Sequence, residues 1–158
     1  MADFHPTSTR EPAGDHVLKV LVVDDHPLNH QVMHAVLPYF DCVATSATSG
    51  EEAVALAAVA AFDLIVMDLH MPGIGGDEAA RRIREAGSSR RAFMARWTTD
   101  TPLRLNGALY DGELEKPMLW ARLGALVREA RWRAYARADE AGRSASHGVG
   151  QGRRLGGR

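Results

Sequence analysis

Residues 62–76 constrain the fold of this chain more than any other stretch. The apolar run at 64–67 does not alternate with polar residues and is too short for a helix, so it predicts a strand buried on both faces. The run ends on Asp68, and the proline and glycines that follow exclude regular structure directly beyond it. A carboxylate at the C-terminal end of a buried parallel strand lies where open α/β sheets carry their chemistry. Asp68 is therefore the first candidate functional residue.

The rest of the chain alternates predicted strands and helices. Strands are expected at 17–23, 42–47, 64–68, 92–97 and 112–114, and helices at 27–39, 53–61, 77–86 and 118–138. This order predicts an α/β domain, doubly wound, with a five-stranded parallel sheet and right-handed crossovers. The interval between Thr99 and Gly112 is too short for a full helix and two loops, so a short turn at 103–106 is expected in place of the fourth helix.

Two tails flank the predicted domain, which covers residues 17–138. Residues 1–16 mix proline, serine, threonine and glycine without periodicity, and residues 139–158 are rich in glycine, serine and arginine, so both are predicted to be disordered. No apolar run approaches the roughly 20 residues that span a bilayer, and the N-terminus lacks a signal-peptide core. We therefore expect a cytoplasmic protein that does not bind membranes. The single cysteine, Cys42, is expected to be a small buried strand residue.

The charge of the chain is distributed unevenly. Residues 1–80 carry 12 acidic and 2 basic side chains, whereas residues 81–158 carry 8 acidic and 17 basic ones. The acidic half is a plausible place for a divalent cation, although two differently charged solvated faces would give the same count. The arginines from Arg128 onward suggest a nucleic-acid arm, but no recognition helix or output domain follows them, so nucleic-acid binding is not expected.

Three carboxylates are expected to share one crevice. Asp24 and Asp25 close the first predicted strand and Asp68 closes the third, and these strands are neighbours when the strand order is 2-1-3-4-5. Carboxylates held close together repel one another, so the cluster is tolerable mainly with a bound hard cation. Oxygen ligands and retained waters fit Mg²⁺, with Mn²⁺ as the alternative.

A hydroxyl and an ammonium group complete the set. Thr98 or Thr99 lies at the end of the fourth strand, and Lys116 lies at the end of the fifth. These parts suit phosphoryl transfer, because a carboxylate can attack phosphorus while a cation, an ammonium and a hydroxyl share the charge on the equatorial oxygens. Each of these residues alone has an ordinary explanation, such as a helix cap or a solvated lysine. Their expected position together at the C-terminal edge of the sheet favours a phosphoryl-transfer site.

This combination resembles the receiver domain of two-component response regulators. The paired acids, the pattern Met-Asp-x-x-Met-Pro-x-x-x-Gly around Asp68, Thr98 and the Lys-Pro pair at 116–117 carry the resemblance, which covers about residues 17–137. Asn29 and the segment 50–53 are most similar to receivers of hybrid kinases and stand-alone relay receivers. The resemblance implies a flavodoxin-like receiver fold with strand order 2-1-3-4-5.

The resemblance also implies a role for each site residue. Four of them are implied to surround the metal: Asp25 as a direct ligand, Asp24 through a water, Asp68 as both ligand and phosphoacceptor, and His70 through its backbone carbonyl. Thr98 corresponds to the switch hydroxyl, with Thr99 as the alternative, and Lys116 to the phosphate-binding lysine. A cis peptide is expected before Pro117.

Two features depart from the family pattern. The interval from Thr98 to Lys116 is shorter than usual, and Glu113 occupies the position that is normally aromatic. Tyr110 is nearby but out of register. Arg96 is unusual inside a buried strand, and we expect it either to snorkel at an uncovered sheet face or to reach the crevice beside Thr98.

The sequence therefore predicts a phosphoacceptor in a two-component or phosphorelay pathway rather than an enzyme. Asp68 is expected to receive a phosphoryl group from a sensor histidine kinase or a histidine phosphotransfer protein and to signal through protein contacts. The alternative is a degenerate receiver that binds partners independently of phosphorylation. A haloacid dehalogenase phosphatase would need a carboxylate where this chain has His70. Whether the domain forms a homodimer is left open.

Overall fold

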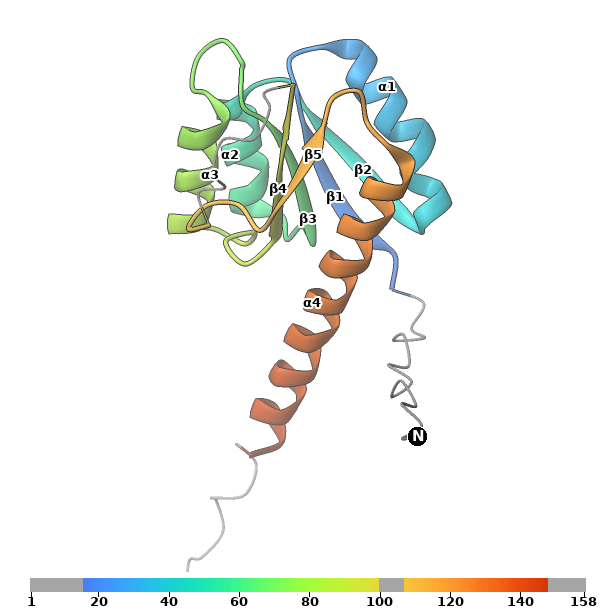
Figure 1. The fold of residues 1–158 in the computed structure, drawn as a ribbon. Coiled ribbons are helices and arrows are strands. Elements are labelled where there is room, and N and C mark those ends of the chain that lie inside the picture. Colours follow the sequence, from blue (N-terminus) through green and yellow to red (C-terminus); the bar gives the residue numbers. More distant parts are fainter. Residues whose placement is uncertain (1–15, 100–106, 148–158) are drawn as a thin grey trace, which may run out of the picture.

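The five strands form one parallel sheet, as the computed structural model shows for residues 16–99 and 107–147 (Figure 1). The strands are β1 (Leu18–Val23), β2 (Cys42–Ala47), β3 (Leu64–Asp68), β4 (Phe93–Thr98) and β5 (Gly112–Glu115). Their order is β2-β1-β3-β4-β5, and each neighbouring pair is parallel. The predicted fold class and strand order are confirmed.

Helices cover both faces of the sheet. The helical elements are α1 (Pro27–Val36), the 3-10 turn η1 (Leu37–Phe40), α2 (Gly50–Val59), α3 (Gly76–Glu85) and α4 (Trp120–His147). Helices α1 and α4 pack on one face, and α2 and α3 pack on the other (Figure 1). The two apolar layers enclose β3, whose five residues are all buried, as its uninterrupted apolar run predicts.

Local chemistry explains where the first two helices begin and end. The Ser49 hydroxyl accepts a hydrogen bond from the Glu52 amide at 3.1 Å, so α2 begins at Gly50, earlier than predicted. The single helix predicted at 27–39 is divided instead, because Pro38 cannot donate to the helix and the chain tightens into η1. Asp41 then takes a left-handed conformation with φ of 54° and leads the chain into β2.

The connection between β4 and β5 contains no helix among its described residues, Thr99 and 107–111. The turn predicted at 103–106 lies outside the residues that the structure describes. Just before β5, the Asp111 carboxylate accepts hydrogen bonds from Arg84 of α3 and Arg133 of α4, both at 2.6 Å, and from the Met94 amide at 2.9 Å. This carboxylate ties the two helices to the edge of the sheet.

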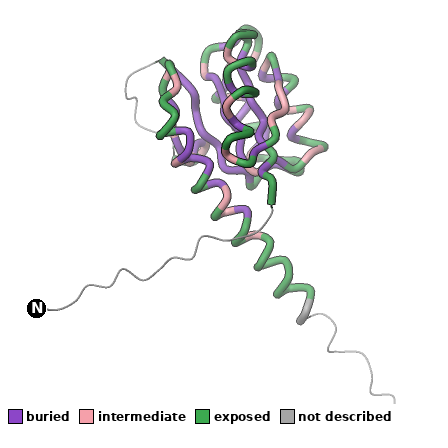
Figure 2. The backbone as a smooth tube through the Cα atoms, turned by 90° about the vertical axis from the view of Figure 1, so that its right-hand side faces the viewer, coloured by how far each residue is buried: buried purple, intermediate pink, exposed green. Residues whose placement is uncertain are grey.

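Helix α4 is longer than the sequence predicted. It continues to His147, so the prediction of disorder was wrong for residues 139–147. Alanine and arginine favour helix in this segment, and Asp139 pairs with Arg143 one turn later at 2.9 Å. Figure 2 shows that the distal part of α4 is exposed, projecting beyond the sheet. Residues 1–15 and 148–158 lie outside the described part.

In the described part of the chain, none of the helices combines the length and the apolar character that crossing a bilayer requires.

Candidate functional site

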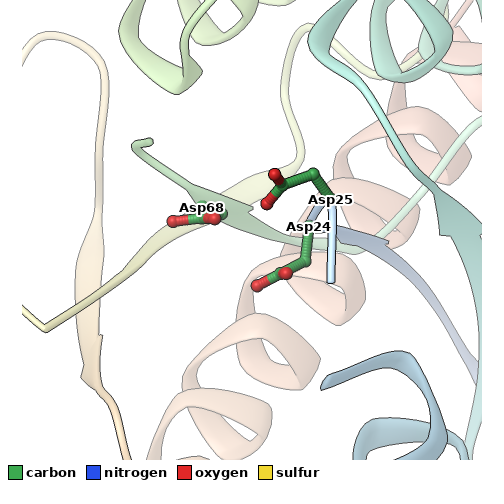
Figure 3. Close-up of side chains that lie close together, drawn as sticks. All are labelled: Asp24, Asp25 and Asp68. Atoms are coloured by element: carbon green, nitrogen blue, oxygen red, sulfur yellow. The ribbon is translucent and has the colours of Figure 1, made fainter. Parts of the chain in front are cut away.

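Three carboxylates gather at the C-terminal edge of the sheet. Asp24 directly follows β1, Asp68 ends β3, and the two strands pair with Val23 beside Met67. One oxygen from each of Asp24, Asp25 and Asp68 lies within 4.8 Å of the others (Figure 3). Asp24 and Asp68 are buried, whereas Asp25 is exposed. The structure thus brings together the acids that the sequence assigned to one crevice.

The Asp24 carboxylate is completely buried and is held by three donors. The His26 amide donates to it at 2.8 Å, the Asn29 side-chain amide at 2.9 Å and the Lys116 ammonium at 2.7 Å. A buried carboxylate without such partners would be strongly destabilising. In the sequence, only the family resemblance points to Asn29. Its side-chain amide reaches the Asp24 carboxylate because Asn29 lies on the first turn of α1, five residues after Asp24.

Lys116 lies between the two buried acids. Its Nζ is 2.7 Å from Asp24 Oδ2 and 3.4 Å from Asp68 Oδ1, and it lies over the Trp97 ring at 4.8 Å from the centroid. The peptide bond between Lys116 and Pro117 is cis, as the resemblance implied. Trp97, the residue before Thr98 on β4, is therefore a neighbour of the site.

Asp68 is an acid whose ionised form is disfavoured by its surroundings. Burial raises its pKa above the usual range, and the nearby Asp24 carboxylate adds to this effect. The Lys116 ammonium and the His70 amide, which donates to Asp68 Oδ1 at 3.3 Å, lower the pKa but do not outweigh burial. A cation at this edge would favour the ionised carboxylate.

Gly76 explains the last position of the motif around Asp68. A side chain at position 76 would clash with the carbonyl oxygen of Asp68, because the start of α3 lies directly against the end of β3. The Gly76 amide also donates to the Leu69 carbonyl at 3.1 Å. Only glycine allows the loop after the strand to fold back this closely.

Thr98 and Thr99 have different surroundings. Thr98 is the last residue of β4 and is buried, whereas Thr99 is exposed. The Thr98 carbonyl accepts a hydrogen bond from the Lys116 amide at 2.9 Å, which places the ends of β4 and β5 side by side. Of the two threonines, Thr98 is the one that belongs to the edge where the carboxylates lie.

Arg96 and Glu113 form an ion pair inside the sheet. They are register partners on β4 and β5, and Arg96 Nη2 lies 2.7 Å from Glu113 Oε2. The Arg96 side chain is only 5 % exposed, so the first of the two expected alternatives, snorkelling to solvent, was wrong, and the second, contact with the crevice beside Thr98, stays a prediction. The physical reason is the countercharge at Glu113, which occupies the position where an aromatic residue was expected. Tyr110 is buried nearby, and burial and the Asp77 carboxylate raise the pKa of its hydroxyl.

The donors at the sheet edge fit a hard divalent cation. All three acidic side chains offer oxygen, the atom that Mg²⁺ and Mn²⁺ prefer, and the neighbouring ammonium does not fully offset their charge. The buried Asp68 carboxylate, with its raised pKa, is the group that would gain most from such an ion.

Comparison with known families identifies the domain. The family model for the response regulator receiver domain matches residues 20–128. The chain belongs to this family. A receiver domain is a signalling module rather than a conventional enzyme.

Curated relatives of the receiver are parts of larger signalling proteins. The virulence sensor protein BvgS of Bordetella bronchiseptica is 40 % identical over 126 residues, covering 74 % of this chain but 10 % of BvgS. The response regulator UvrY of Escherichia coli is 35 % identical over 89 residues, covering 55 % of this chain and 41 % of UvrY. The chain therefore spans only a minor part of these relatives.

Solved receiver structures are similar over almost their entire length. The receiver domain of the sensor histidine kinase PA1611 from Pseudomonas aeruginosa, described with a magnesium ion in its active-site cleft, aligns with a TM-score of 0.65 and 26 % identity, covering 73 % of this chain and 98 % of that one. The chemotaxis protein CheY4 of Vibrio cholerae aligns with a TM-score of 0.67 and 28 % identity, covering 73 % and 99 %.

Proposed function

We propose that this receiver accepts a phosphoryl group on Asp68 from a phosphohistidine of a sensor histidine kinase or a histidine phosphotransfer protein, and signals through protein contacts. One observation carries the proposal. The Asp68 carboxylate lies at the same sheet edge as two further acids and 3.4 Å from the Lys116 ammonium, which is the arrangement that phosphoryl transfer to a carboxylate needs.

In the proposed reaction an Asp68 oxygen attacks the phosphorus of phosphohistidine. The new O–P bond forms as the N–P bond breaks, and the imidazole nitrogen leaves with the electron pair of that bond. The Lys116 ammonium lies close enough to Asp68 to contact an oxygen of the transferred group. The Thr98 hydroxyl, at the end of the neighbouring strand, is proposed to bind a second oxygen.

The residues proposed to hold Mg²⁺ are the carboxylates of Asp24, Asp25 and Asp68 and the backbone carbonyl of His70. When bound, the ion neutralises negative charge on the phosphoryl oxygens and on the acidic cluster. The magnesium ion described in the PA1611 receiver supports this assignment. Asn29 and the His26 amide keep the Asp24 carboxylate oriented whether or not Lys116 remains bound to it.

Incubation with acetyl phosphate and Mg²⁺ tests the proposal directly. We expect intact-mass spectrometry to show one added phosphoryl group on the wild-type chain and none on Asp68→Asn. Asp41→Asn is the matched control, because Asp41 has a positive φ that asparagine tolerates and it lies outside the site, so it should be phosphorylated normally. Phosphorylation that persists in Asp68→Asn would refute the assignment.

The Arg96–Glu113 ion pair favours a second candidate, a degenerate receiver whose partner contacts do not respond to phosphorylation. An ion pair fixed at the position of the usual aromatic residue could leave the β4–β5 edge unchanged when Asp68 is modified. Hydrogen exchange with and without beryllofluoride separates the two. Changed protection of the β5 amides supports the phosphorylation switch, whereas changes confined to the amides next to Asp68 support the degenerate module.

A further inference from the structure

Trp97 lies directly beside the proposed phosphoacceptor. It is the register partner of Asp68 on the adjacent parallel strand, so both side chains point to the same face of the sheet. The Trp97 side chain is 2 % exposed and belongs to the apolar layer that also contains Leu114 and Leu123. The indole ring therefore forms one wall of the crevice that holds Asp68.

The same ring carries the Lys116 ammonium. Lys116 Nζ lies 4.8 Å from the centroid of the Trp97 ring, well within the range of a cation–π interaction. The electron-rich face of an aromatic ring attracts a cation, and tryptophan attracts it most strongly. Because the Lys116 side chain is only 18 % exposed, little water competes with the ring for the ammonium group.

The indole nitrogen provides a second observation. Trp97 Nε1 is buried and has no hydrogen-bond partner among the residues that the structure describes. A buried tryptophan usually pairs this group, and a phenylalanine at the same position would bury no polar atom at all. Packing alone therefore does not explain a tryptophan here, whereas its stronger attraction for an ammonium does.

We propose that Trp97 is a positioning residue for Lys116, holding the ammonium group over the ring so that it can move from Asp24 to a phosphoryl oxygen on Asp68. Lysine is a point charge on a flexible four-carbon stem, so it needs a lateral restraint to stay in one place. The ring supplies that restraint without a directed hydrogen bond, and the ammonium can shift along the ring face between the acids 2.7 Å and 3.4 Å away. This inference rests on the proposed phosphorylation of Asp68.

A series of fluorinated tryptophans tests the role of the ring. In a Trp120→Phe, Trp132→Phe background, Trp97 is the only tryptophan, and both replaced side chains are half exposed. Fluorination withdraws electron density from the ring face with little change in shape. We expect the rate constant of phosphorylation by acetyl phosphate to fall with each added fluorine, by about tenfold over the series, as the loss of a desolvated cation–π contact implies.

Substitutions and a spectroscopic readout complete the test. Trp97→Phe should retain more of the rate than Trp97→Leu, and the ring-current shift of the Lys116 Cε protons should be present with tryptophan and lost with leucine. Equal rates across the fluorinated series, with a slow Trp97→Leu, would assign Trp97 to packing and overturn the inference. Failure of the wild-type chain to be phosphorylated would instead refute the proposed function, while the ring-current shift would still report whether ring and lysine are in contact.

Discussion

Strand β3 differs from β4 and β5 in where it carries charge. In β3 every residue before Asp68 is apolar and buried, so the acid stands at the strand end, where a ligand can reach it. In β4 and β5 a charged pair, Arg96 and Glu113, lies within the strands and is covered. The candidate functional charges are therefore at the open edge of the sheet, whereas Arg96 and Glu113 lie inside it and pair with each other.

The two kinds of charge differ in whether they already have a partner close by. We expect the charges at the strand ends to respond to a cation or a phosphoryl group, because three carboxylates lie within 4.8 Å of one another and the Lys116 ammonium faces two of them. A charge that is paired inside the sheet already has an opposite charge close by, as Arg96 has in Glu113 at 2.7 Å. The proposed phosphoacceptor edge can thus keep its acidic residues while the β4–β5 edge carries different contacts, such as the Arg96–Glu113 pair.

The largest expected effect comes from separating the buried pair. Arg96→Met should destabilise the protein by about 3 kcal/mol, because it leaves the Glu113 carboxylate, whose side chain is only 17 % exposed, without its countercharge. The double variant Arg96→Met, Glu113→Leu should recover most of that loss, since two apolar side chains replace two charges. Urea unfolding of the single and double variants measures the coupling. A double variant as unstable as Arg96→Met would show that the pair is not a self-contained unit.

Asp111→Asn should lower the free energy of unfolding by a smaller amount. Burial alone raises the pKa of Asp111, but the Met94 amide and the Arg133 and Arg84 guanidiniums together hold it below the usual range. Because the folded pKa is depressed, this carboxylate stabilises the fold above the unfolded pKa of about 4, and the contribution is lost as pH falls through the folded value. We expect Asp111→Asn to lower the free energy of unfolding by about 2 kcal/mol at neutral pH.

The pH dependence distinguishes this role from simple packing. In urea unfolding at a series of pH values, the difference in unfolding free energy between the wild-type protein and Asp111→Asn should become smaller as the pH falls below the ordinary pKa of aspartate. A free-energy difference that stays constant down to acid pH would show that the ionised carboxylate does not hold α3 and α4 together.

Asp68→Asn should change the free energy of unfolding least of the three substitutions, and it should raise it rather than lower it. Burial raises the pKa of Asp68 in the folded protein, so this group favours folding when it is protonated, and that contribution is lost as the pH rises through the folded pKa. With a metal chelator at neutral pH, Asp68→Asn should therefore be slightly more stable than the wild-type protein, and the difference should disappear in acid. Thermal unfolding at both pH values measures it. If Asp68→Asn were less stable than the wild-type protein at neutral pH, the acid at the end of β3 would stabilise the fold as the charges in β4 and β5 do, and the difference between the strands would be refuted.

Several parts of the site could be predicted because they depend on short stretches of sequence. The apolar run of β3, its terminal Asp68 and the glycine that lets α3 approach it are local signals, and the paired acids after β1 are read in the same way. Helix α2 starts at Gly50 rather than at the predicted residue 53, because the Ser49 hydroxyl caps it through the Glu52 amide. Helix α4 continues to His147 rather than ending at the predicted residue 138. The composition after residue 138 predicts a tail, but helical pairs such as Asp139 and Arg143 continue there.

The sequence by itself determined the order of strands and helices, the acids at the strand ends and the lysine that accompanies them, because each is fixed by residues close together in the chain. Only the tertiary structure decided that Arg96 is paired with Glu113 and that Trp97 lies beside Asp68 and beneath Lys116. These contacts depend on the register between neighbouring strands. Register arises from packing across the whole sheet, and no short segment of the sequence specifies it.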